Sequence, residues 1–307
     1  MEKNNKTLLY KHISKYSYAN WILSLFHTMS TLCLFYICIK YLNIITVPLL
    51  SLILVRTFII FHDLAHNNFF PNKKINFLLG NIFGILILTP LSNWTEEHSL
   101  HHKHANNINK KQYTQTAVWT LEQYNKSNFL DKLKYKFIYG KYTLFTIIPW
   151  LYFTVYQHSK ANIYENTCHL LYILIIFCYF NWYNIFLIFV AYWFASIIGF
   201  FIFHSQHSFD GVYKEKQEKW DYFLNGIYGC SFLQVPWYLQ FFTLGIEYHH
   251  IHHLNAMIPS YNLKNCHDSS KELFDDVKKV YISDIIHNMS YSLYDFNAKN
   301  FEDVYEN

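Results

Sequence analysis

Charged side chains are scarce in this sequence. Asp, Glu, Lys and Arg make up 15% of its 307 residues, whereas hydrophobic residues make up 52% and aromatic residues 21%. A typical soluble domain has about 25% charged residues, so the composition argues against an ordinary soluble protein. The lysines are too scattered to form a basic tract with interleaved aromatics, which argues against nucleic-acid binding. We therefore expect a protein that lies partly in a lipid bilayer and has no nucleic-acid partner.

Several other features are missing. The six cysteines form no C-x-x-C pair, so reduced, structural thiols are expected. No internal repeat and no Gly/Ser/Pro-rich linker is present, which favours one domain over residues 1–307. The first twenty residues are polar and no small-residue cleavage site follows them, so no cleavable signal is expected. The partly acidic segment 296–307 is expected to be a mobile tail.

Long apolar runs are abundant. Runs of spanning length cover about 21–39 and 44–61, and a longer run is interrupted at Asn181-Trp-Tyr-Asn184. A spanning helix needs about 17–25 apolar residues, so the longer run predicts two spans, at about 163–181 and 184–203. The predicted fold is an all-α polytopic membrane protein with four transmembrane helices in two hairpins.

Two shorter apolar runs, 76–90 and 144–156, predict interfacial or re-entrant segments. If 76–90 crossed the bilayer alone, the histidines before and after it would lie on opposite sides. Lysines precede the first span and lie between the hairpins, so the positive-inside rule predicts cytoplasmic termini and a cytoplasmic histidine-rich cap, 62–160 and 204–290. The expected membrane is the endoplasmic reticulum for a eukaryotic or eukaryote-infecting source and the cytoplasmic membrane for a bacterium.

Histidines occur in three clusters, His-Asp-Leu-Ala-His at 62–66, His-Ser-Leu-His-His at 98–102 and His-His-Ile-His-His at 249–253. Spacings of three and four residues place imidazoles on one helical face, and neutral imidazole binds iron, zinc, copper or nickel. One such pair could be ordinary interfacial histidines, but three clusters in one chain indicate a metal site. His207, at the end of the last span, is a further candidate and His204 a possible one, although a lone histidine there is more often a cap.

Nine imidazoles exceed what one ion accepts, so two metal ions are predicted. His104 and His250 are out of phase with their clusters and are not expected to bind metal. Arg56, inside the second span, is either a functional group or a side chain that snorkels to the surface. Nearby acids could orient the imidazoles or be solvated: Asp63, Glu96, Glu97, Asp210 and Glu247. The predicted ligands are His62, His66, His98, His101, His102, His207, His249, His252 and His253.

The segment from about Arg56 to His267 resembles the integral-membrane fatty acid desaturases, most closely their acyl-lipid (omega or DesA-like) branch. Arg-Thr-Phe-Ile-Ile-Phe-His-Asp-Leu-Ala-His, 56–66, is similar to the first histidine box of that branch. His-Ser-Leu-His-His-Lys-His-Ala-Asn, 98–106, is similar to the second, and Tyr-His-His-Ile-His-His-Leu-Asn-Ala-Met-Ile-Pro-Ser-Tyr-Asn-Leu, 248–263, to the third. Gln206-His207 looks like the extra ligand after the fourth span. One departure is Gly245-Ile246-Glu247, where the branch reads Asn-Ile-Gly.

The resemblance implies a di-iron enzyme (Fe2+/Fe3+) that uses O2 to introduce a cis double bond into a fatty acyl lipid or acyl thioester, with all nine imidazoles as iron ligands. The sequence contains no His-Pro-Gly-Gly haem motif, so a separate electron donor is expected, a b-type cytochrome or a ferredoxin with its reductase. Two alternatives stay open. Membrane hydroxylases, epoxygenases and carotenoid ketolases share the scaffold, and a non-enzymatic metal-binding or transport protein would carry polar residues aligned within several spans.

Overall fold

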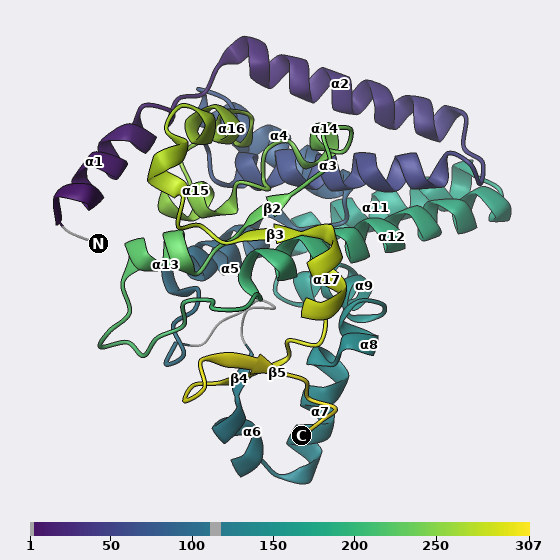
Figure 1. Cartoon of the computed structure of the whole chain (residues 1–307). Helices are drawn as coiled ribbons and strands as arrows, with labels where there is room; N and C mark the ends of the chain where they lie inside the picture. Colours follow the sequence, from purple (N-terminus) through teal and green to yellow (C-terminus); the bar gives the residue numbers. More distant parts are fainter. Residues whose placement is uncertain (1–2, 111–117) are drawn as a thin grey trace.

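The computed structural model describes residues 3–110 and 118–307, which form a mostly helical protein (Figure 1). The predicted cap therefore includes a stretch, 111–117, that lies outside the described residues. Four apolar helices run side by side, and shorter elements gather toward one end of them and below them in this view. The four are α2 (Trp21–Lys40), α3 (Val47–Ala65), α11 (Ile163–Tyr179) and α12 (Trp182–His207).

Within the described residues, α2, α3 and α12 are long and apolar enough to cross a membrane, and α11 is a shorter apolar helix of 17 residues. Helix α3 packs against both α2 and α12 and is largely buried. Helix α2, in contrast, exposes large apolar side chains such as Ile22 (77% exposed) and Phe26 (60% exposed). Apolar side chains on the outside of such a helix suit contact with lipid. The four-span topology and its cytoplasmic orientation stay predictions.

Asparagine caps explain where the long apolar run breaks. The side chain of Asn181 accepts a hydrogen bond from the backbone N–H of Asn184 and so begins α12. Asn162 caps α11 in the same way, accepting from the backbone N–H of Glu165. Each cap satisfies a donor that the first helical turn leaves without a partner. The run is therefore two helices, as predicted, and α12 continues beyond its predicted end to His207.

Helices α4 (Lys73–Leu86) and α5 (Leu91–His104) are separated by a short break at which the chain bends by 103°. The bend returns α5 to the end of α3, where the ring of His98 lies against that of His62. This agrees with a re-entrant segment at 76–90, although by length and composition the pair could also form one broken span.

Arg56 does not snorkel to a surface. Its side chain is fully buried, and its guanidinium donates to Thr31 Oγ1 (2.8 Å) and to the backbone carbonyl of Phe241, and lies 2.9 Å from His27 Nδ1. The guanidinium carbon also lies 3.9 Å from the centroid of the Phe241 ring. The side chain thus joins α2 and α3 to α14 (Gln240–Thr243). The snorkelling interpretation is wrong because partners for this cation are available inside the helix bundle.

The fold is mostly helical, as predicted, but it also contains short strands. One sheet has the order β1-β4-β5, with β1 and β4 parallel and β4 and β5 antiparallel, and β2 and β3 form a separate parallel pair. Each strand has only two or three residues, too few for an alternating pattern to be recognised in the sequence. The strands are β1 (Trp119–Thr120), β2 (Phe232–Gln234), β3 (Lys279–Tyr281), β4 (Leu293–Asp295) and β5 (Asn300–Glu302).

The C-terminal segment 296–307 is packed, so the expectation of a mobile tail is wrong. Strand β5 lies in this segment and pairs with β4. Phe301 is 4% exposed and Val304 is fully buried. Burial of these two apolar side chains holds the segment against the rest of the protein, because apolar area removed from water stabilises the packed form.

The remaining elements are short and lie partly around the end of the bundle at which α3 and α12 finish and partly below the bundle in this view (Figure 1). The predicted interfacial segment 144–156 is divided among several of them. They are α1 (Lys3–Ser14), α6 (Leu121–Lys126), α7 (Phe129–Tyr139), α8 (Lys141–Leu144), α9 (Ile148–Leu151), a π-helical turn (Tyr152–Tyr156), α10 (Gln157–Ser159), α13 (Tyr222–Tyr228), α15 (His249–Leu254), α16 (Ser260–Asp268), a 3-10 turn (Lys271–Phe274) and α17 (Ile282–Asn288).

Candidate metal centre

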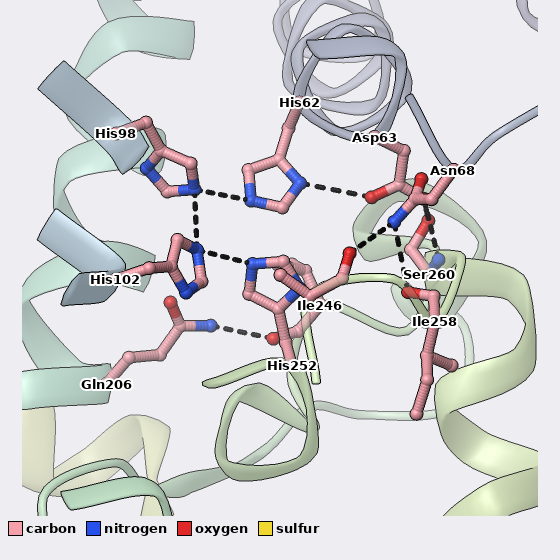
Figure 2. Close-up of polar contacts among 11 residues, drawn as sticks. His62, Asp63, Asn68, His98, His102, Gln206, Ile246, His252, Ile258 and Ser260 are labelled. Atoms are coloured by element: carbon pink, nitrogen blue, oxygen red, sulfur yellow. Dashed lines mark hydrogen bonds and ion pairs between the residues drawn. The ribbon is translucent and has the colours of Figure 1, made fainter. Parts of the chain in front are cut away.

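The histidine clusters converge where α3, α5, α12 and α15 meet. Figure 2 shows His62 from α3, His98 and His102 from α5 and His252 from α15 with their rings directed toward one another. The position of α15 depends on close packing against α13, because a Cβ added to Gly226 would lie 2.6 Å from Leu254 Cδ2. A larger residue at Gly226 would therefore require Leu254, the last residue of α15, to shift.

The nine predicted residues fall into two groups of potential metal ligands. Within each group the ligand nitrogens all lie within 4.8 Å of one another. The ring centroids of His102 and His253, one from each group, are 4.3 Å apart, so the groups are in contact. Group one is His62, His66, His98, His102 and His252, and group two is His101, His207, His249 and His253.

In group one, the Nε2 atoms face a common centre. His98 Nε2 lies 2.9 Å from His62 Nε2 and 3.0 Å from His102 Nε2, and His252 Nε2 lies 3.0 Å from His102 Nε2. Two nitrogens bound to one ion at about 2.0–2.1 Å are separated by roughly 3 Å when the angle between them is near 90°. His66 Nε2 is buried and has no hydrogen-bond partner among the described residues. A metal ion would satisfy this lone pair.

Group two has the same character with four rings. His207 Nε2 lies 2.9 Å from His249 Nε2, and His101 Nε2 lies 3.2 Å from His253 Nε2. His207 Nδ1 donates to the backbone carbonyl of Gly229 at 3.3 Å, which leaves Nε2 as the nitrogen that faces the group. Five and four neutral imidazoles, with no carboxylate in either group, fit a transition metal such as iron and do not fit calcium or magnesium.

Helical spacing alone does not decide which rings share a group, because the i, i+3 pairs His98/His101 and His249/His252 are divided between the two groups. The i, i+4 pairs His62/His66, His98/His102 and His249/His253 each stay together in one group. Sequence neighbours are separated instead, because adjacent residues on a helix point in directions about 100° apart. His101 and His102 therefore serve different groups, and so do His252 and His253.

Asp63 orients one of these rings. Its Oδ1 accepts from His62 Nδ1 at 3.0 Å, and its Oδ2 accepts from both the backbone N–H and the hydroxyl of Ser260 at 2.6 Å, as Figure 2 shows. The carboxylate is fully buried. Because Asp63 holds the Nδ1 proton of His62, the Nε2 lone pair is directed at the group. Of the two alternatives for Asp63, a partner that orients an imidazole or a solvated acid, this buried contact with His62 supports the first.

We expect Asp63→Asn to weaken metal binding in group one by about 10-fold to 100-fold, the usual effect of removing a carboxylate that orients a ligating imidazole. Competitive titration of the purified protein with a chelator measures this affinity. Asp210→Asn is the matched control, since Asp210 accepts from Tyr291 OH instead. An unchanged affinity in Asp63→Asn would show that the hydrogen bond to His62 has no part in metal binding.

The other predicted acids have different surroundings. Glu96 is exposed, and Glu97 accepts from Tyr156 OH and Gln157 Nε2 and pairs with Lys160. Glu247 is buried with one carboxylate oxygen lacking a partner among the described residues, and burial raises the pKa of its carboxyl. All three lie outside both groups.

The unassigned histidines also lie outside both groups. His204 Nε2 donates to the backbone carbonyl of Asn288 at 2.8 Å, so the structure does not support His204 as a ligand. His250 Nε2 lies 3.3 Å from His267 Nδ1, away from the two groups. The exclusion of His104 and His250 agrees with the structure, because neither belongs to a group.

Burial keeps the imidazoles neutral. The pKa values of His249, His252 and His253 are lowered well below 6.5, first by burial and then by repulsion from neighbouring rings. In the unfolded chain the same side chains bind protons near pH 6.5. The metal-free fold therefore has its full stability above about pH 6.5 and loses stability as the pH falls below this value, by up to about 1.4 kcal/mol per pH unit for each such imidazole.

We accordingly expect the metal-free protein to melt at a distinctly lower temperature at pH 5.5 than at pH 7.5. Thermal unfolding in detergent, followed by circular dichroism, measures the shift. The metal-loaded protein is the control, because ligand nitrogens occupied by an ion bind protons less readily. Equal melting temperatures of the metal-free protein at the two pH values would contradict the assignment of buried, neutral imidazoles.

An apolar cavity ends at the two groups. It lies between α3 and α12 and is lined largely by aliphatic and aromatic side chains, with Leu54 and Tyr192 among those farthest from the helix ends. His62 and His98 of group one and His249 of group two form part of its wall. From His62 to Leu54 the cavity follows α3 for eight residues, about 12 Å along the helix axis.

The model of the fatty acid desaturase family matches residues 40–284, which is most of the chain and includes all nine histidines of the two groups. The chain belongs to the fatty acid desaturase family. This confirms the resemblance inferred from the histidine boxes. The two groups of histidines thus lie within the part of the chain that matches this family.

Individual relatives share 23–29% identity with this desaturase-family chain. A fatty acid desaturase of Bacillus subtilis is 29% identical over 81% of this chain and 73% of its own length. An sn-1 oleoyl-lipid 12-desaturase of Anabaena variabilis is 25% identical over 71% of this chain and 66% of its own length. A chloroplastic omega-6 fatty acid desaturase of Glycine max is 23% identical over 70% of this chain and 53% of its own length.

Several residues around this desaturase-family site were not identified from the sequence. Gly199 and Gln206 line the cavity, a role that the sequence did not indicate although it singled out Gln206 beside His207, and Lys214 is buried in the loop between α12 and α13. A glycine or glutamine within an apolar helix carries no signal for a cavity wall. The lysine lies in a segment rich in charged residues, 214–219, which suggests a solvated loop.

Proposed function

We propose that this protein is an oxygen-dependent fatty acyl desaturase that introduces a cis double bond into the acyl chain of a membrane lipid. The observation that carries the proposal is the apolar cavity whose wall includes His62 and His98 from group one and His249 from group two. A substrate in this cavity contacts both metal positions. An alkyl chain is the kind of substrate that such an apolar, elongated cavity suits.

The nine histidines would hold two iron ions, five in group one and four in group two. When bound, the iron pair would supply, together with O2, the oxidising power that an unactivated C–H bond requires. Two hydrogens leave the acyl chain as one C=C bond forms. O2 takes up these hydrogens with two external electrons and two protons, and two water molecules result.

The protein's own groups bind and orient the substrate. Aromatic side chains such as Phe58 and Phe200 exclude water from the cavity, and their apolar surface favours the alkyl chain over water. Asp63 keeps the His62 ring in one orientation. Electrons would come from a separate protein, a b-type cytochrome or a ferredoxin, and the site would lie on the cytoplasmic side of the membrane.

Expression in a yeast strain that lacks its own desaturase, followed by lipid profiling, tests the proposal. We expect a new cis double bond in lipid-bound acyl chains and two iron ions per chain in the purified protein. Hydroxylated or epoxidised acyl chains, or oxygenated carotenoids in a host that makes them, would instead indicate another oxidation on the same scaffold. A single labile zinc ion with no oxygen consumption would indicate a metal-binding or transport protein.

A further inference from the structure

Lys214 is a buried cation near group two. It lies in the loop between α12 and α13 and is 5% exposed. Its Nζ donates to Asn106 Oδ1 at 2.9 Å and lies 5.8 Å and 5.4 Å from the ring centroids of Tyr294 and Phe301. Within residues 3–110 and 118–307, no carboxylate forms an ion pair with it. Burial of a charge without a counterion is costly, and little solvent is present to screen its effect on nearby groups.

A chain of buried polar contacts connects Lys214 to group two. Asn106 accepts from Lys214, and its own Nδ2 donates to the backbone carbonyl of Gly229 at 2.8 Å. The same carbonyl accepts from His207 Nδ1 at 3.3 Å. The ring of His207 then faces His249 through Nε2. The ammonium group is also close enough to act electrostatically on His101 and His207, both members of group two.

A positive charge beside a metal position has two effects there. It repels a divalent cation, which weakens binding, and it disfavours the higher oxidation state, which raises the reduction potential. Both effects are strong in a buried environment because little solvent screens the charge. Burial lowers the pKa of Lys214 to about 7, so protonation of its ammonium group is favoured at pH values below 7.

We propose that Lys214 makes the two metal positions unequal, loosening the ion held by His101, His207, His249 and His253 and raising the reduction potential of that ion. Lys214 acts through the polar contacts and the electrostatic field and does not bind the ion, so it is a positioning residue. This inference rests on the proposed function only in requiring that both groups bind metal. Group two also has fewer potential ligands than group one, four against five, which further weakens its binding of an ion.

Three variants of the full chain test the role of the charge. Lys214→Met removes the charge and keeps a linear side chain of similar length, and Lys214→Gln removes the charge but keeps a hydrogen-bond donor. Lys214→Arg keeps the charge. If the charge is the active feature, Lys214→Met and Lys214→Gln behave alike and Lys214→Arg behaves like the original protein.

The first measurement is the release of Co2+ from the purified, cobalt-loaded protein to a chelator at pH 6. We expect two phases in the original protein, and we expect the fast phase to slow by roughly tenfold in Lys214→Met and Lys214→Gln, a typical effect of one neighbouring charge. The slow phase should not change. The second measurement is a redox titration of the iron-loaded protein, in which the same two variants should shift one midpoint potential downward.

Equal release rates and equal potentials in the original protein, Lys214→Met and Lys214→Gln would overturn the inference. So would faster metal loss in all three variants, because that result means that Lys214 only packs. A protein that gives the expected release and potentials but no desaturated product supports this inference and contradicts only the proposed function. A protein that holds fewer than two ions contradicts both.

Discussion

His252→Gln is expected to weaken the binding of the ion in group one and His253→Gln the binding of the ion in group two, and each change is expected to lower acyl desaturation by more than about 100-fold. The two residues are adjacent in α15, yet His252 belongs to group one and His253 to group two. Glutamine fills most of the imidazole volume but provides no ring nitrogen for the ion. Metal analysis of the purified variants and product analysis in yeast give the two readouts.

The absorption spectrum of the cobalt-loaded protein distinguishes an effect on the group-one ion from an effect on the group-two ion, because the two groups provide different numbers of nitrogen ligands. His250→Gln is the matched control in the same helix. His250 is fully buried and contacts His267 outside both groups, so this variant should retain two ions. Loss of the same ion in His252→Gln and His253→Gln, or loss of both ions in His250→Gln, would contradict the division into two groups.

Gly199→Phe is expected to lower desaturation at least about tenfold while both metal ions stay bound, because the new ring fills the apolar cavity. A Cβ added to Gly199 would meet no atom within 4 Å, so the position borders open space within the cavity wall. An apolar pocket can separate two substrates that differ by one methylene group by about 10-fold to 200-fold in kcat/KM. A phenyl ring fills far more of the cavity than one methylene group does. Desaturation of substrates whose acyl chain extends only a short way past the metal positions should be lowered least.

Gly199→Ala is the control for the change in backbone freedom. It adds only a methyl group and should preserve activity, and it should stabilise α12 by about 0.5–1 kcal/mol because alanine loses less conformational freedom than glycine in a helix. Product profiles in yeast and metal content of the purified proteins decide the outcome. Normal desaturation of long chains by a folded Gly199→Phe protein would mean that the substrate does not occupy this cavity.

Much of the candidate site could be predicted from the sequence because helical spacing is a local property. The pairs His62/His66, His98/His102 and His249/His253 are four residues apart, so each pair shares a helical face wherever the helix lies. His207 was identified from its place at the end of an apolar run. The clusters were also sufficient to identify the family, which the match over residues 40–284 confirms.

The rest depended on contacts between segments far apart in the chain. Assignment of neighbours such as His101 and His102 to different groups follows from where α12 and α15 lie around α5. The burial of Arg56 depends on partners in α2 and α14. The burial of Lys214 depends on Asn106, more than one hundred positions earlier in the chain. None of these partners is visible in the local pattern around the residue concerned.

Local composition and periodicity thus determined the apolar helices, the paired imidazoles and the family, because hydrophobic length and i, i+4 spacing act within one segment. Only the tertiary structure decided how the rings are divided between two metal positions, which apolar side chains enclose a cavity beside them, and which charges lose contact with water. These properties arise from the packing of segments that are distant in sequence, and packing sets distance, burial and the electrostatic surroundings together.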